Sequence, residues 1–407
     1  MEFGFTEQQE KLREEMMEFY RKELPEDLDG GVPAIDKELQ DFWMNLQKKA
    51  GSKGYLTPGW SKETGGLGLG HMELGVANEV VAYWGVVWPN VIGLHICGPG
   101  IHLFGTDAQK QRILPEISSG EKVWFECFTE PDAGSDEANQ QTRAVKDGDD
   151  YVINGQKIYI TGRYYPDWLL VEARTADTVP KHRGLTLFAF PTDTPGVSIK
   201  PLPCMGGYSA HEVFFDDVRV HQDTMVGQEN QGFYHVMQTF EFERSNTGAA
   251  VGAKRRLQNF IQFCKEEKRN GKPLIADPDV RKKLARMAID TEMLRLSAWR
   301  TAWRFGERQR LGPLDFDLTG FFTRMNAEAH PSWMMEILGP YAQLRQGSKW
   351  AKLKGSLERT WQVTRSYHYA GTTEVMKLVL AGRVLGLPRI PAKLNTTIMQ
   401  ALQEKKK

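Results

Sequence analysis

The sequence predicts an α+β protein in three parts: an N-terminal α-helical domain, a middle antiparallel β domain and a C-terminal four-helix bundle. Helical apolar spacing fills residues 1–122, short β runs separated by turn residues fill 123–226, and long helical segments return in 227–407. No long polar linker separates these parts. We therefore expect one cooperative unit whose domain interfaces are favoured places for a ligand cleft.

The N-terminal part, from about Thr6 to Lys122, has helical spacing interrupted by Thr57–Trp60 and by the glycine-rich stretch Gly65–Gly70. A glycine-rich stretch indicates dinucleotide binding when it follows a strand and opens a βαβ unit. Because Gly65–Gly70 follows no evident strand, we predict a plain loop there.

The middle part has the two-residue period of strands. Asn154–Gly155 predicts a tight turn, and the strand that follows presents Tyr159 and Thr161 on the same face. The predicted strand runs are Tyr151–Ile153, Lys157–Ile160, Trp168–Val171, Leu185–Phe190 and Glu212–Phe215.

The C-terminal part has helical spacing in long segments, which is typical of a bundle. In the first of them, Glu243 lies on the flank of one helical stripe that includes Phe240 and Arg244, so its carboxylate would face the margin of the core. The predicted helices are Phe233–Phe263, Asp279–Arg308, Phe316–Leu338 and Gly347–Tyr367.

Composition excludes several classes of protein. Fifty-two basic side chains balance 52 acidic ones, so no net field draws the chain to nucleic acid or to an anionic membrane. No apolar run approaches the roughly 20 residues that span a bilayer. The first residues lack a signal-peptide pattern, and the four cysteines lack the paired spacing of a zinc site. We therefore expect free thiols and a cytoplasmic protein.

Residues Cys127–Asp136 carry the strongest chemical signal. They gather hydroxyls, backbone donors and small side chains into a turn that can approach a flat ring or a phosphate closely. By contrast, His95, His102 and His235 show no spacing typical of a metal site, and we expect each to pack or to satisfy a polar group.

Four ordered segments resemble the acyl-CoA dehydrogenase family, and the resemblance covers essentially the whole chain. The similar segments are the family's flavin and substrate loop at Thr129–Asp136, its second flavin strand at Asn154–Thr161, the end of its β domain at Glu212–Val220 and its C-terminal flavin segment at Gly371–Thr373.

The resemblance implies FAD as cofactor and an acyl-CoA thioester as substrate. Tyr159 stands where many members have tryptophan, and the exchange keeps an aromatic wall beside the flavin. The residues assigned to the cofactor are Phe128, Thr129, Ser135, Tyr159, Thr161, Thr372 and Glu374. Those assigned to the substrate are Ser135, Glu241, Arg244, His95, Tyr369, Ala370 and Gly371. An aromatic-rich pocket of Trp88, His95, Phe240, Tyr367 and His368 would suit a cyclic, aryl or branched acyl group.

The family places its general base at one of two positions. One corresponds to Ala370 here, which cannot accept a proton. The other immediately precedes an arginine on the first long helix of the C-terminal domain and corresponds to Glu243. The resemblance therefore implies that Glu243 removes the α proton while hydride leaves the β carbon for the flavin. Without the resemblance, Glu243 is equally well explained as the ion-pair partner of a buried arginine.

The resemblance also implies electron transfer to electron-transfer flavoprotein and assembly as a homotetramer or homodimer. Two segments that bind FAD across a subunit boundary in the family are altered here, at Glu266–Gly271 and Glu336–Pro340. Three alternatives therefore stay open: a heteromer, a non-catalytic subunit of such a heteromer, and an oxidase or flavin monooxygenase on the same fold.

Overall fold

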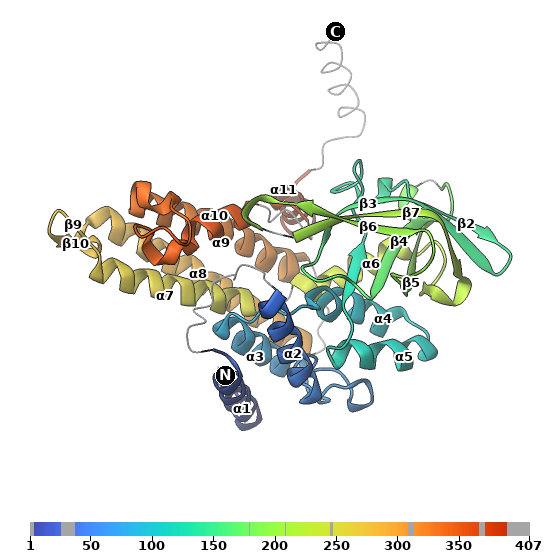
Figure 1. Cartoon of the computed structure of the whole chain (residues 1–407), viewed down its shortest axis with the longest axis horizontal. Coiled ribbons are helices and arrows are strands. Elements are labelled where there is room, and N and C mark those ends of the chain that lie inside the picture. Colours follow the sequence, from blue (N-terminus) through green and yellow to red (C-terminus); the bar gives the residue numbers. More distant parts are fainter. Residues whose placement is uncertain are drawn as a thin grey trace, which may run out of the picture.

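The computed structural model describes residues 4–25, 37–178, 180–207, 209–244, 247–307, 313–365 and 371–388, with the backbone alone at 37, 38, 241–244, 313 and 316. Figure 1 shows the β-sheet at one end, the long C-terminal helices at the other, and the N-terminal helices lying along both. The predicted order of helical, β and helical parts is confirmed.

The N-terminal helices begin at side-chain caps. Thr6 Oγ1 accepts a hydrogen bond from Gln9 N while the Gln9 side chain accepts one from Thr6 N, and Thr106 and Gln109 repeat this capping box. The predicted loop at Gly65–Gly70 joins a short 3₁₀ turn to α3. The elements are α1 (Glu7–Glu23), α2 (Lys37–Ser52), α3 (His71–Trp84), a π-helical turn (Gly93–Cys97), α4 (Gly98–Phe104) and α5 (Asp107–Ser118).

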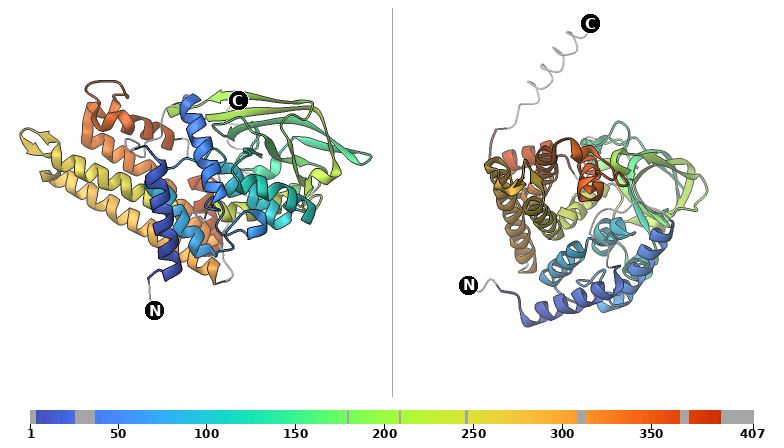
Figure 2. Two further views of the ribbon diagram at one scale, coloured as in Figure 1. Left: turned by 60° about the horizontal axis from the view of Figure 1, so that its bottom comes forward. Right: turned by 60° about the vertical axis from the view of Figure 1, so that its left-hand side comes forward.

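The middle part is an eight-stranded sheet within the described residues, and it curls around its own apolar core, as the ring of strands in the right-hand view of Figure 2 shows. Its strands are mainly antiparallel, but β1 pairs with β4 in parallel, and Trp124 stacks on its register partner Trp168 with ring centroids 5.1 Å apart. The strands are β1 (Trp124–Cys127), β2 (Arg143–Asp147), β3 (Asp150–Thr161), β4 (Trp168–Arg174), β5 (Leu185–Pro191), β6 (Val197–Pro203), β7 (Ser209–His221) and β8 (Met225–Val226).

The predicted turn at Asn154–Gly155 is wrong. Both residues lie inside β3, where the register with β7 shifts between Ile153 and Gly155. Gly155 has a φ of 149°, and a Cβ there would lie 2.5 Å from Thr142 Oγ1 and 2.7 Å from Thr142 Cα. The glycine therefore marks a close approach of β3 to Thr142, the residue that precedes β2. The hairpin turn falls instead at Gly148, between β2 and β3.

The C-terminal helices pack around a third apolar cluster to form the predicted bundle. Two helices replace the single one predicted over 233–263, and Thr247 Oγ1 fixes the start of the second by donating to Gly75 O on α3 at 2.7 Å. The helices are α6 (Gly232–Arg244), α7 (Gly248–Glu266), α8 (Pro278–Gly306), α9 (Pro313–Leu338), α10 (Ser356–Thr364) and α11 (Thr373–Val379), with a two-strand hairpin of β9 (Lys268–Arg269) and β10 (Lys272–Pro273).

The helix predicted over Gly347–Tyr367 is wrong in its first half, because α10 begins only at Ser356. Leu353, Lys354 and Gly355 all have positive φ, which a helix does not allow. A Cβ at Gly355 would lie 2.3 Å from Gln346 N, so the chain turns back on itself there. Residues 366 and 367 of the predicted helix lie outside the described residues.

Buried polar groups connect the first two parts of the chain. Asn90, which is fully buried, donates its backbone N–H to Gln47 Oε1 and accepts at Oδ1 from Trp124 N, both at 2.8 Å. Gln47 in turn donates to Gly120 O. One apolar cluster also extends from α1 and α5 into β1, β4 and β5. The entry into the β domain is therefore fixed to the helices, which supports the expected cooperative unit.

Substitution of Gly155 by alanine tests the close approach of β3 to Thr142. We expect Gly155→Ala to lower the free energy of unfolding by about 1–3 kcal/mol, because the new Cβ meets the Thr142 backbone. Urea unfolding measures the loss. Gly148→Asn is the matched control, since Gly148 also has a positive φ but open space around its Cβ, and asparagine tolerates that conformation. Equal losses in the two variants would contradict the close packing.

Candidate functional site

The turn after β1 and the end of β3, predicted separately to bind the flavin, lie side by side. Ile158 N donates to Thr129 O at 2.9 Å, which joins the strand to the turn. Tyr159 and Thr161 lie on the outer face of β3, with Ile160 buried between them, as predicted. Phe128 is buried beside them and packs edge-on against Phe240 of α6 at 6.0 Å. The β domain and α6 therefore meet at this turn.

Tyr159 is held in an uncommon conformation. Its φ is 58°, in the left-handed region that tyrosine rarely adopts, and its side chain is 62% exposed. It lies in a bulge, because the register of β3 with β7 shifts between Lys157 and Ile160. Strained backbone is concentrated at ligand sites, so this exposed aromatic side chain is a candidate wall for a flat ligand.

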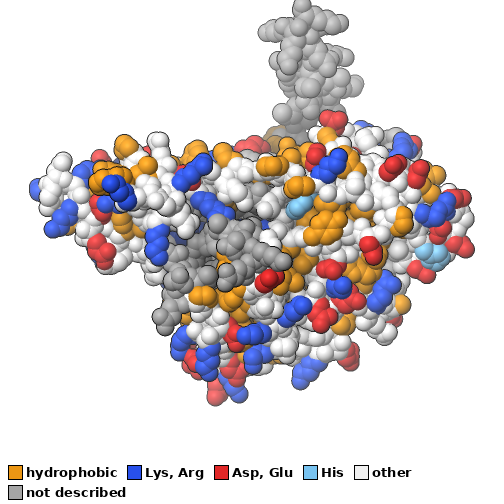
Figure 3. All heavy atoms as spheres, in the orientation of Figure 1, with side chains coloured by type: hydrophobic (Ala, Val, Ile, Leu, Met, Phe, Trp, Pro, Cys, Tyr) orange, Lys and Arg blue, Asp and Glu red, His pale blue; other side chains and the backbone are white. Residues whose placement is uncertain are grey.

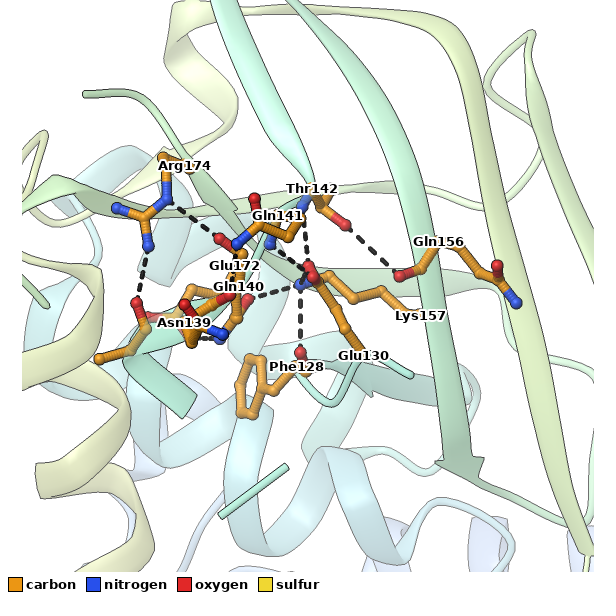
Figure 4. Close-up of polar contacts among 11 residues, drawn as sticks. Phe128, Glu130, Asn139, Gln140, Gln141, Thr142, Gln156, Lys157, Glu172 and Arg174 are labelled. Atoms are coloured by element: carbon orange, nitrogen blue, oxygen red, sulfur yellow. Dashed lines mark hydrogen bonds and ion pairs between the residues drawn. The ribbon is translucent and has the colours of Figure 1, made fainter. Parts of the chain in front are cut away.

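A buried ammonium group lies directly behind the turn. Lys157, with no exposed side-chain surface, donates to Phe128 O at 3.1 Å, to Glu130 Oε1 at 2.9 Å and to Gln140 Oε1 at 2.5 Å. Figure 4 shows it reaching from β3 into the loop between β1 and β2. Glu130 also accepts from Gln141 N and Thr142 N. Burial opposes ionisation of Glu130, but Lys157 and these hydrogen bonds outweigh it and lower its pKa.

The loop is fixed from its other side by β4. Arg174 donates from Nε to Gln140 O at 3.0 Å and from Nη2 to Ala138 O at 2.7 Å. Glu172, fully buried, accepts at Oε2 from Gln140 Nε2, whereas its Oε1 has no hydrogen-bond partner among the described residues. Burial raises the pKa of Glu172 to about 7, against the opposing effects of Lys157, Gln140 and Arg174.

Ser135 lies at the outer end of this loop. Glu130 and Ala133 exchange two backbone hydrogen bonds, which close a tight turn and leave Gly134 and Ser135 exposed beyond it. The Ser135 hydroxyl is therefore available to a ligand at the surface. Glu130, by contrast, is buried and has a structural role, because it accepts hydrogen bonds from Lys157, Gln141 and Thr142.

A cavity of about 420 Å³ lies between α3, the π-helical turn, α7, α9 and α10. Trp88 and His95 line it, as predicted for a pocket, whereas Phe240, predicted for the same pocket, is not among its lining residues. Burial lowers the pKa of His95 to about 4, so its imidazole is neutral at physiological pH. A volume of this size falls within the roughly 300–1,000 Å³ typical of pockets for drug-sized ligands.

The sequence interpretation missed the residues that open this cavity. Gly248, Ala249, Gly252 and Ala253 line it, and their spacing places them along one face of α7. Because these side chains are absent or a single methyl group, the helix leaves space where larger residues would fill it. The run Gly248–Ala253 in the sequence was the available signal.

The remaining predicted histidines have packing roles. His102 stacks on Trp60 with centroids 6.2 Å apart, and His235 stacks on Phe104 at 4.1 Å. The four cysteines are free thiols. Within the described ranges, no group of three or more His, Cys, Asp or Glu side chains is placed to hold a metal ion. Nor does any described helix combine the length and apolar character needed to cross a membrane.

The C-terminal site residues are only partly described. Gly371 has a φ of 91°, Thr372 caps α11 by accepting from Val375 N at 3.2 Å, and Glu374 is exposed in the first turn of that helix. Tyr367, His368, Tyr369 and Ala370 lie outside the described residues. So do the side chains of Glu241, Glu243 and Arg244, whose backbone forms the last turn of α6.

Comparison with protein families accounts for almost the whole chain. Three family models match in order: the acyl-CoA dehydrogenase N-terminal domain over residues 6–121, its middle domain over 126–218 and its C-terminal domain over 230–385. The chain belongs to the acyl-CoA dehydrogenase family. The family, the fold and the oxidoreductase class expected from the sequence are therefore confirmed.

Individual members of the acyl-CoA dehydrogenase family align end to end with this chain. "Acyl-CoA dehydrogenase FadE26" of Mycobacterium tuberculosis is 32% identical over 401 residues, covering 96% of this chain and 99% of that protein. The ChsE4-ChsE5 complex from the same organism contains a chain with 31% identity and a TM-score of 0.84, over 96% of this chain and all of that one. A structure described as "Tcur3481-Tcur3483 steroid ACAD" has 29% identity and a TM-score of 0.85, with the same coverage.

The raised pKa of Glu172 predicts a stability difference that depends on pH. Between its unfolded pKa of about 4.5 and its folded pKa of about 7, the folded state holds a proton that the unfolded state has lost. Its contribution to stability is therefore lost as the pH rises through this window. We expect Glu172→Gln to match the wild type at pH 5 and to be more stable by on the order of 1–3 kcal/mol at pH 8.

Urea unfolding at the two pH values measures this difference. Asp177→Asn is the control, because Asp177 is exposed and its hydrogen bond with Arg143 lowers its pKa, so it stays ionised at both pH values. Its effect on stability should be the same at pH 5 and pH 8. If the free energy of unfolding of the wild type and of Glu172→Gln changed with pH in the same way, the raised pKa of Glu172 would be ruled out.

Proposed function

We propose that the protein is an FAD-dependent dehydrogenase that oxidises the Cα–Cβ bond of an acyl-CoA thioester. Family membership over all three domains supports the reaction class. The observation that carries the assignment to this chain is the position of the cavity. The residues of α7 that line it begin at Gly248, and Glu243 precedes them at the end of α6. An acyl group in that cavity would have its reacting carbons near the end of α6.

The described residues fit a flavin. Tyr159 and Thr161 give an exposed aromatic side chain and a hydroxyl on one face of β3, and the Thr129 turn is hydrogen-bonded to the same strand. Gly134 and Ser135 leave the outer end of the turn open to a larger ligand. Hydrophobic side chains also gather on the face of the β domain next to the helices (Figure 3). When bound there, FAD supplies the acceptor for the hydride that leaves Cβ.

In this proposal Glu243 is the general base. The side chain of Ala370 cannot accept a proton. The carboxylate of Glu243 on α6 therefore removes the proton from Cα of the acyl group. A carboxylate in a water-poor cleft is a stronger base than the same group in solution. Glu241, Arg244 and Ser135 bind the CoA moiety, and the backbone near Ala370 and Gly371 orients the thioester carbonyl.

We propose a bulky cyclic acyl group as the substrate. The small side chains of α7 widen the cavity, and aromatic Trp88 with neutral His95 provides flat walls. The description of one similar solved structure contains the words "steroid ACAD", which favours a fused-ring acyl group over a straight chain.

We propose that the reduced enzyme passes electrons to electron-transfer flavoprotein, and that a second subunit completes the FAD site. Both similar solved structures are named for pairs of proteins, ChsE4-ChsE5 and Tcur3481-Tcur3483. One altered segment forms an exposed hairpin of β9 and β10 at the far end of α7, and the other ends α9 at Leu338. A partner that differs from this chain would account for both changes, and the site would then lie partly in that partner.

Glu243→Gln tests the proposed base. We expect the variant to keep bound FAD while the rate of flavin reduction by acyl-CoA falls roughly 10²- to 10⁴-fold, because the amide cannot accept the α proton. Stopped-flow absorbance without oxygen measures the rate. Glu241→Gln, on the same helix, should raise KM and leave the reduction rate near the wild-type value. Near-normal reduction by Glu243→Gln would place the base elsewhere.

Ala249→Leu tests the role of the cavity. The larger side chain should lower kcat/KM for fused-ring acyl-CoA thioesters by roughly tenfold to 200-fold, because it fills space the ring needs, while a short straight-chain thioester is affected little. Steady-state assays with both thioesters measure the change. Val251→Leu, two residues along α7, is the matched control. Faster wild-type turnover of the short thioester than of any cyclic one would rule out the bulky substrate.

A further inference from the structure

We propose that Lys157 is a positioning residue: it fixes the Phe128–Thr129 turn against the bulge that carries Tyr159, and so sets the geometry of the flavin site. The inference rests on the proposed function, because the site that it orders is the one assigned to FAD. The ammonium group of Lys157 is buried and donates its hydrogen bonds to the loop between β1 and β2, so it is assigned to the support of the site and not to its surface (Figure 4).

Two consecutive residues of β3 hold two consecutive carbonyls of the turn. Lys157 Nζ donates to Phe128 O at 3.1 Å, and Ile158 N donates to Thr129 O at 2.9 Å. The first bond comes from a side chain inside the sheet and the second from the strand backbone. Together they fix both the position and the orientation of the turn relative to β3, which a single bond would not do.

The same lysine anchors one side of the bulge. The side chains of Lys157 and Ile160 both point into the domain, and they are 0% and 2% exposed. In a regular strand one residue separates two inward-pointing side chains, but here two residues separate them, because the strand bulges. This arrangement turns Tyr159 outward at a φ of 58°. Backbone of this kind is strained and persists only where the surrounding contacts determine it. The three bonds of Lys157 supply such contacts on the side facing the turn.

Stability alone is a poor explanation for this ammonium group. A buried ion pair such as Lys157 with Glu130 is often replaced by apolar groups of the same shape without loss of stability. The Lys157 network also includes Glu172, whose Oε1 has no hydrogen-bond partner in the described part of the chain. All three acceptors of Lys157 lie in the loop between β1 and β2, which indicates that its role is to place that loop.

The double variant Lys157→Met, Glu130→Gln tests the proposal, since it removes the charge pair and keeps the shapes of both side chains. We expect a folded protein, by circular dichroism and thermal unfolding, that binds FAD roughly tenfold more weakly and reduces it about 100-fold more slowly, with KM for acyl-CoA little changed. The visible spectrum and the midpoint potential of the bound flavin should both shift. A folded double variant with wild-type FAD affinity, spectrum and potential would overturn the proposal.

Two further variants separate positioning from folding. Glu130→Gln alone is milder and should move the same flavin readouts in the same direction; a lower unfolding temperature with an unchanged flavin spectrum would mean a purely structural role. Glu172→Gln alters the same network away from the turn and should leave the flavin spectrum unchanged; a shift as large as that of the double variant would overturn the proposal. Wild-type protein that binds no FAD, alone or together with a partner subunit, would overturn the proposed function, whereas failure of the double variant alone would leave that function standing.

Discussion

A buried ammonium group needs hydrogen-bond acceptors for all three of its protons, and this requirement shapes the loop between β1 and β2. Lys157 obtains its acceptors from Phe128, Glu130 and Gln140, which are spread over thirteen residues of that loop. The loop can satisfy them only by wrapping around the lysine. The positions of Thr129 and Ser135 then follow from the course of the loop, as does the contact of Phe128 with α6.

Much of the fold could be predicted because the apolar period changes from helical to strand-like and back along the chain. Two of the errors came from glycine. Asn154–Gly155 has the composition of a hairpin turn, but Gly155 is needed because Thr142 leaves no room for a Cβ. Gly355 likewise stops a helix by approaching Gln346. In each case the cause is a contact with a residue about ten positions away along the chain, which the residues on either side of the glycine do not reveal.

The candidate site, like the fold, was predicted from the sequence only in part. Alternation along β3 correctly put Tyr159 and Thr161 on one face, but strict alternation would put Lys157 on that face too, whereas the bulge turns it inward. The cavity depends on α7 facing α3 and α9, which apolar spacing alone could not specify. The resemblance supplied the Glu243 prediction, and its test rests with the Glu243→Gln experiment because the side chain lies outside the described part.

The first and second halves of α7 differ in the size of their side chains. Leu257, Phe260 and Cys264 in its second half hold the bundle together, whereas the small residues in its first half leave the cavity open. Packing of the bundle and the space of the cavity are therefore assigned to different residues of one helix. If an acyl group occupies the cavity as proposed, a methyl group added at Ala249 or Gly252 would reduce the space for it, while Leu257, Phe260 and Cys264 would keep the same packing.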